Sequence, residues 1–250
     1  MDMEWVVPMI RGRKMEQNLI TVAKIHTEFP DKFGIPRQSG LVPSLRAEIV
    51  FEPEFRSMDA IRGLEEFSHI WLLWSFSKAK KEHISLTVTP PRLGGKEKKG
   101  VFATRAPFRP NGIGLSSVKL EDIYLDEKRG PILVVSGADL LDGTPIYDIK
   151  PYLPYTDSHP NAKGSFAEAH KSDKIKVIIS DELMEKIPKN LQTRILEVLE
   201  QDPRAAYNKK PDYVYGMRFL EYDIRFTVAQ QVLTVQDIVR FRDEIYAKVK

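Results

Sequence analysis

The chain has 250 residues, a formal net charge of +3 and no cysteine. Its 42% hydrophobic and 29% charged residues are typical of a globular protein. The longest apolar stretch, residues 70–76, is far shorter than the roughly 20 residues of a membrane-spanning helix. The lack of cysteine excludes disulfides and thiolate zinc sites, and the N-terminus does not resemble a signal peptide. We therefore expect a cytoplasmic protein with no membrane partner.

Positive charge is concentrated in one part of the chain. Residues 78–109 hold nine basic and two acidic residues, so nine minus two leaves this segment at +7. Such a segment suits a polyanion, because each phosphate contact releases counterions. A solvated lysine-rich loop without a binding role is the alternative.

Apolar runs in the first 150 residues predict mostly strands, separated by prolines and glycines. We expect strands at residues 19–25, 47–51, 67–76, 86–89, 101–104, 115–125 and 132–136. Asp59 is expected to cap a short helix at 60–65, and His69 to lie inside the core. Many short strands with such turns indicate a closed or sandwiched β architecture.

The pattern changes after residue 160. A weakly patterned linker precedes a strand at 175–179, an amphipathic helix at 191–199 and a hairpin at 217–235. The fold class is therefore mainly β, with a small α+β part at the C-terminus. We divide the chain into an N-terminal extension (1–18), a β-barrel-like domain (19–160) and a small α+β domain (161–250).

The signatures of several other enzyme classes are missing from the sequence. It contains neither a dinucleotide-type glycine fingerprint nor a phosphate-binding glycine loop, which disfavours a Rossmann methyltransferase. The five histidines lack metal-ligand spacing, and residues 139–148 lack the ligand pattern of a calcium loop. Asp157, Ser158 and His159 are sequence neighbours, whereas a hydrolase triad is assembled from distant segments. We expect no metal.

Three segments combine rigid turns with charged or amide side chains: residues 35–40, 100–120 and 137–153. The side chains concerned are Arg37, Gln38, Arg105, Arg109, Asn111, Asp142 and Lys150. Each segment alone is explained as a well-made turn. Three of them in one chain favour a ligand site.

Long stretches of the chain closely resemble the TrmO-type tRNA methyltransferases. They are PRQSG, RGLEEFSHIWLLWSF, PPRLGG, GVFATRAPFRPNGIG and DLLDGTPIYDIKPYLPYTDS, within residues 19–158, with a weaker similarity at QDPRAAY. The resemblance implies a non-Rossmann β-barrel methyltransferase domain, a small C-terminal domain and a homodimer. It implies S-adenosyl-L-methionine, bound near the subunit interface, as the cofactor. The implied substrate is tRNA, methylated on the exocyclic amine of threonylcarbamoyladenosine beside the anticodon.

The resemblance also implies which residues form the site. The cofactor-binding positions are Pro36, Arg37, Gln38, Ser77, Lys78, Arg105, Leu115, Ala138, Asp139 and Leu140. We predict that Asn111 and Asp142 contact the amine as catalytic residues. Arg109, Lys150 and Arg204 are predicted to contact RNA, where a guanidinium binds phosphate or carboxylate in bidentate fashion. Methyl transfer from a sulfonium mainly requires that donor and acceptor are held in line, so it needs no metal.

The chain departs from the family pattern at a few positions. Ser77 and Lys78 stand where many relatives carry histidine or another polar group, and Gly112 stands where relatives often have proline. The first 18 residues have no counterpart, so a shifted substrate preference stays open. Two other functions also stay open: a non-catalytic RNA-binding protein, and an enzyme that uses the same cofactor on a different acceptor.

Overall fold

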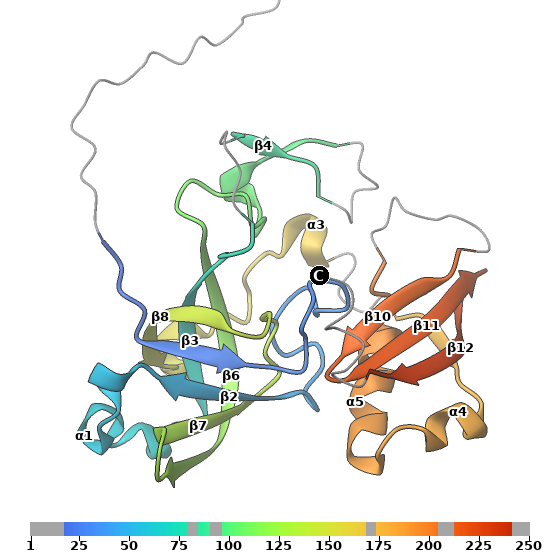
Figure 1. Cartoon of the computed structure of the whole chain (residues 1–250). Helices are drawn as coiled ribbons and strands as arrows, with labels where there is room; N and C mark the ends of the chain where they lie inside the picture. Colours follow the sequence, from blue (N-terminus) through green and yellow to red (C-terminus); the bar gives the residue numbers. More distant parts are fainter. Residues whose placement is uncertain (1–17, 80–84, 91–96, 169–173, 205–212, 242–250) are drawn as a thin grey trace, which may run out of the picture.

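The protein is described by a computed structural model that covers residues 18–79, 85–90, 97–168, 174–204 and 213–241 (Figure 1). Most of its regular structure is strand, which confirms the expected mainly β class. Two sheets, each with its own hydrophobic core, make up the bulk of the described chain. No helix within these ranges is long and apolar enough to span a membrane.

The first sheet closes on itself. Its strands are β1 (Ala23–His26), β2 (Arg46–Phe51), β3 (His69–Ser75), β6 (Ile113–Asp126), β7 (Gly130–Ser136) and β8 (Thr144–Pro151). They are joined antiparallel in the order β1-β2-β7-β6-β3-β8, and β8 pairs with β1 again to form a closed barrel. Alternate residues of β3, including Ile70 and Leu72, point into the interior and are fully buried. This alternation sends every second side chain to one core, as the pleat requires.

The second sheet has the order β10-β11-β12-β9, in which β9 runs parallel to β12. Its strands are β9 (Lys176–Ile178), β10 (Tyr215–Phe219), β11 (Tyr222–Ala229) and β12 (Val232–Arg240). The helices α4 (Asp181–Glu185) and α5 (Lys189–Glu200) belong to this part. The predicted face of α5 is confirmed, because Leu191, Ile195, Val198 and Leu199 are all buried.

Several short elements lie outside the two large sheets. They are η1 (Pro53–Phe55), α1 (Met58–Ile61), η2 (Leu64–Glu66), β4 (Thr87–Val88), β5 (Lys99–Gly100), η4 (Val101–Ala103), α2 (Pro154–Asp157) and α3 (Ser165–Glu168). Figure 1 shows β4 in an arm above the closed sheet, with the second sheet to one side. The arm carries part of the basic segment, and residues 80–84 and 91–96 of that segment lie outside the described residues.

Four sequence-based expectations about these elements were wrong. Residues 101–103 form a 3-10 turn instead of a strand, since Arg109 donates to the carbonyls of Val101 and Thr104 and so stabilises the turn. The cap of α1 is Ser57, whose hydroxyl accepts from the main-chain N–H of Asp59. His69 is exposed at the start of β3. Residues 144–151 were expected only as part of a turn segment, but they form β8. Prolines and acids interrupt the alternation of apolar and polar residues in this strand.

The segment between β1 and β2 links the two parts of the chain. Phe29, Val42 and Leu45 lie in the core of the second sheet, although they precede β2 in the sequence. Buried Glu28 accepts from the Arg194 guanidinium of α5 at 2.7 Å, and its carbonyl accepts from the N–H of Leu220 at 2.8 Å. The division at residue 160 stays a prediction, and residues 27–45 pack across it.

Candidate functional site

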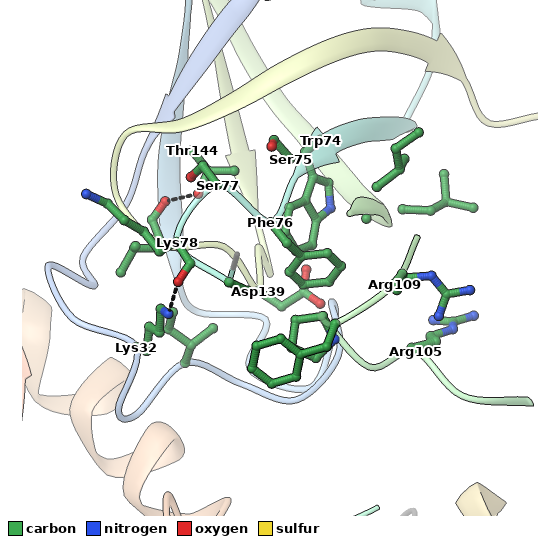
Figure 2. Close-up of a pocket in the computed structure, with 18 of the residues that line it drawn as sticks. Lys32, Trp74, Ser75, Phe76, Ser77, Lys78, Arg105, Arg109, Asp139 and Thr144 are labelled. Carbon is green, nitrogen blue, oxygen red and sulfur yellow. Dashed lines mark hydrogen bonds between the residues drawn. The ribbon is translucent and has the colours of Figure 1, made fainter. Parts of the chain in front are cut away.

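A cavity of about 550 Å³ lies where β3 ends and β6 begins. Its walls come from residues 32–38, 74–79, 104–115 and 139–144. All three turn segments that stood out in the sequence therefore reach one cavity, together with the aromatic end of β3. Figure 2 shows the side chains around it.

Most of the predicted cofactor positions line this cavity. They are Pro36, Arg37, Gln38, Ser77, Lys78, Arg105, Leu115 and Asp139. Ala138 and Leu140 do not, because they flank Asp139 with their side chains buried in the core of the closed sheet. The structure thus places Asp139 alone of this trio at the cavity wall.

The apolar side of the cavity includes the aromatic residues Trp74, Phe76 and Phe108. The rings of Trp74 and Phe76 meet edge to face, with centroids 4.3 Å apart. Gly114, opposite Trp74 in the β3–β6 register, leaves room for the indole: a Cβ there would lie 2.3 Å from the ring. Sequence reasoning placed Trp74 in a strand but not in the site. A large aromatic residue at a strand end next to polar residues was the available signal.

Asp139 is the acidic group of the cavity. Its Oδ1 accepts from the hydroxyl of Ser116 at 2.6 Å, and that hydroxyl accepts from Nε1 of Trp74 at 3.0 Å. Burial raises the pKa of Asp139 above its ordinary value, while the hydrogen bond from Ser116 and the charge of Arg105 oppose this rise. Asp139 is thus a desolvated acceptor whose charge depends on its donors.

Hydrogen bonds tie the cavity walls together. Arg105 donates to Oε1 of Gln38. Lys32 donates to the carbonyl of Lys78, as Figure 2 shows. Arg37 donates to the main-chain carbonyls of Asp202 and Arg204, both at 3.2 Å. The loop that carries Pro36 to Gln38 is therefore fastened both to the basic segment and to the C-terminal part.

Two family models match this chain. The N-terminal domain of tRNA-methyltransferase O matches residues 24–158, and the TrmO C-terminal domain matches residues 172–241. The chain belongs to the tRNA-methyltransferase O family.

Similar proteins support this membership along most of the chain. The tRNA (adenine(37)-N6)-methyltransferase of Escherichia coli is 40% identical over 215 residues, which cover 83% of this chain and 91% of that protein. A putative S-adenosylmethionine-dependent methyltransferase of Pseudomonas aeruginosa is 40% identical over 220 residues, 85% of this chain and 93% of that one. A crystal structure of TrmO from Pseudomonas aeruginosa superposes with a TM-score of 0.71 at 34% identity, covering 90% of this chain and 100% of that chain.

The two residues predicted to be catalytic in this TrmO-family chain do not line the cavity. Asn111 is exposed in the turn before Gly112, whose φ is +59°. Asp142 lies between the cavity residues Leu141 and Thr144, and its Oδ1 accepts from the N–H of Thr27 at 3.1 Å. The same oxygen lies 3.2 Å from Nδ1 of His26.

The three predicted RNA contacts lie in different surroundings. Arg109 lines the cavity, with part of its guanidinium bound to the carbonyls of Val101 in η4 and of Thr104 just after it. Lys150 is exposed on β8 and ion-paired with Asp148 at 2.8 Å. Arg204 is only 7% exposed and lines a second cavity of about 460 Å³, where it binds Asp202 at 2.8 Å. Their roles stay predictions.

Neither the neighbouring residues 157–159 nor the acids considered as metal ligands form a second site among the described residues. Asp157 accepts from Nε1 of Trp71 at 2.8 Å and from the N–H of Leu153 at 2.9 Å, so its carboxylate caps a turn. Among the described residues, no group of three or more His, Cys, Asp or Glu side chains is placed to hold a metal ion.

Proposed function

We propose that the chain transfers a methyl group from S-adenosyl-L-methionine to the exocyclic amine of adenine 37 in tRNA. We further propose threonylcarbamoyladenosine as the form of that adenine which it accepts. The family membership and the names of the relatives support the reaction class. The observation that carries the assignment to this chain is the gathering of eight predicted cofactor positions around one cavity.

The residues around the cavity suit this cofactor. Its volume of about 550 Å³ is within the range of small-molecule sites. Aromatic faces at Phe76 and Phe108 suit a purine ring and attract a cation, which the sulfonium is. Asp139 offers an acceptor to hydroxyl or amino groups. When bound, the cofactor supplies an activated methyl group, and the chain's own residues hold the donor in line with the acceptor.

The acceptor amine requires separate handling, because its lone pair is delocalised into the purine ring. In threonylcarbamoyladenosine this nitrogen carries a single N–H. A group that accepts this proton raises the nucleophilicity of the nitrogen, and a base or water takes the proton when the methyl group replaces it. We keep Asn111 and Asp142 as the residues for this contact. A base within a folded tRNA loop has to leave its stack to reach them, and Arg109 and Lys150 are the proposed phosphate or carboxylate contacts.

The remaining expectations complete the proposal. The closed sheet is the non-Rossmann methyltransferase domain, and the part after residue 160 is a small α+β domain that contributes Arg204 to tRNA binding. We propose a homodimer located in the cytoplasm. Two exposed apolar side chains support the homodimer, because a partner subunit would cover them. They are Leu115 at the cavity, which is 51% exposed, and Phe102, which is 77% exposed.

Transfer of a labelled methyl group tests the proposal. Purified protein, labelled cofactor and threonylcarbamoylated tRNA should give label in the tRNA, and the same tRNA with guanosine at position 37 should give none. Binding of tRNA without transfer would support the non-catalytic alternative. Label that persists without adenine 37 would support a different acceptor.

A further inference from the structure

A buried chain of hydrogen bonds leads from an indole to the carboxyl group of the cavity. Trp74 is 7% exposed and Ser116 is 1% exposed. Nε1 of Trp74 lies 3.0 Å from the Ser116 hydroxyl, which lies 2.6 Å from Oδ1 of Asp139. β3 supplies the first residue, β6 supplies the second, and the third follows β7.

The chemistry of the three groups fixes the direction of this chain. An indole nitrogen can only donate, so the Ser116 oxygen is the acceptor of the first bond. A hydroxyl has one proton, which is then directed at Asp139. The hydrogen bond therefore favours the ionised carboxylate over the protonated acid.

The position of the indole depends on Gly114. A Cβ at this residue would lie 2.3 to 2.6 Å from three atoms of the Trp74 ring, closer than any real contact. The glycine and the serine are two residues apart on β6 and are both buried. Together they form a slot for the ring and a partner for its nitrogen, which explains this arrangement better than core packing alone.

We propose that Trp74 and Ser116 are positioning residues that hold Asp139 oriented toward the cavity as an acceptor for a hydroxyl or amino group of the cofactor. This inference rests on the proposed function, because it assumes that the cavity binds the cofactor. Neither residue touches the reacting atoms: Trp74 acts through Ser116, and Ser116 acts through Asp139. The carboxylate also accepts from the main-chain N–H groups of Asp139 itself and Ser39, and it lines the cavity, where a donor of the cofactor can reach it.

Calorimetric binding of S-adenosylhomocysteine to the full-length protein tests the inference. Asp139→Asn should weaken binding most, and Ser116→Ala should weaken it roughly tenfold, as expected for a hydrogen bond to a charged group. Trp74→Phe should weaken it a few-fold. In the double variant, Trp74→Phe should add nothing to Ser116→Ala, because the indole acts only through the hydroxyl.

A pH series provides a second readout. Affinity should rise with pH as Asp139 ionises. Ser116→Ala removes a donor to the carboxylate, so its pKa increases and the rise in affinity should move to higher pH. Ser117→Ala is the matched control, since Ser117 is the neighbouring β6 residue and does not line the cavity. Thermal unfolding monitors the fold of each variant.

The outcomes separate this inference from the proposed function. Normal affinity in Asp139→Asn would refute the assignment of Asp139 to the cofactor. The hydrogen-bond chain from Trp74 through Ser116 to Asp139 would then have no role in cofactor binding. Asp139→Asn could bind weakly while Ser116→Ala binds normally and shows an unshifted pH series. That result would overturn the positioning role of Trp74 and Ser116 and leave the proposed function intact. Additive losses in the double variant would show that Trp74 acts by packing.

Discussion

Asp142 connects the turn before β8 to the end of β1. Its carboxylate accepts from the N–H of Thr27, and its own N–H donates to the carbonyl of Phe29 at 2.9 Å. The neighbouring Leu141 and Thr144 line the cavity, so Asp142 lies beside the site without forming its wall. A role in contacting the target amine thus places the RNA base at the rim of the cavity.

Asp142→Ala should reduce methyl transfer by about a hundredfold or more, in the range of a lost acid–base contribution. The affinity for S-adenosylhomocysteine should be largely unchanged, because Asp142 does not line the cavity. Single-turnover transfer and calorimetry measure the two effects. Asp59→Ala is a control, since Asp59 is exposed on α1. Near-normal transfer in Asp142→Ala would remove Asp142 from the catalytic residues.

At the scale of the elements, the loop after β1 is packed tightly against β10. Gly34 has a φ of +100°, and a Cβ there would lie 2.6 Å from Sδ of the fully buried Met217. The loop then continues to Pro36 and Gln38 at the cavity. A close approach that only glycine permits therefore sets the position of one cavity wall.

Gly34→Ala should lower the free energy of unfolding by about 2 to 4 kcal/mol, since overpacking adds to the strain of a positive φ. Gly63→Ala shares the positive φ, at +85°, but its Cβ meets nothing within 4 Å. It should cost only about 1 to 2 kcal/mol. Urea denaturation of both variants gives the comparison. Equal losses would mean that Met217 moves aside freely.

Strongly periodic elements could be predicted from the sequence. Elements whose conformation depends on contacts between distant segments could not. The periodicity of α5 marked its buried face, and the hairpin of β11 and β12 was expected around Gln230 and Gln231, which adopt positive φ. η4 depends on Arg109, a contact that local propensity does not contain. For the site, motif resemblance gave the polar wall. The link from Trp74 to Ser116 joins two strands through register and could not be read from either alone.

At the scale of the whole molecule, residues 27–45 connect the closed sheet to the second sheet. Glu28 and Ser44 bind α5 through Arg194 and Glu197, and Asp31 binds Arg218 of β10 at 3.2 Å. Arg37 adds its bonds to the carbonyls near Arg204. The cavity wall and the C-terminal part are therefore held as one unit, which places the proposed cofactor and tRNA contacts in a fixed relation.

Glu28 makes this connection sensitive to pH. Burial raises its pKa above the ordinary 4.5, and the hydrogen bonds from Arg46 and Arg194 offset only part of the rise. With a raised folded-state pKa, its contribution to stability is complete below about pH 4.5 and is lost as pH rises through the folded-state pKa. Relative to Glu28→Gln, the wild-type free energy of unfolding should fall with rising pH.

Urea unfolding of both proteins between about pH 4 and pH 7 measures this difference, and the other carboxyl groups cancel in the comparison. A difference that grows with pH would contradict the assigned direction of the Glu28 shift.

The central claim is that this chain methylates the exocyclic amine of adenine 37 in tRNA. Mass spectrometry of nucleosides from tRNA incubated with and without the protein and S-adenosyl-L-methionine tests it most directly. We expect threonylcarbamoyladenosine to decrease and a product heavier by one methyl group to appear, with the added mass on the base. No methylated form of this nucleoside, in the presence of protein that binds S-adenosylhomocysteine, would contradict the claim.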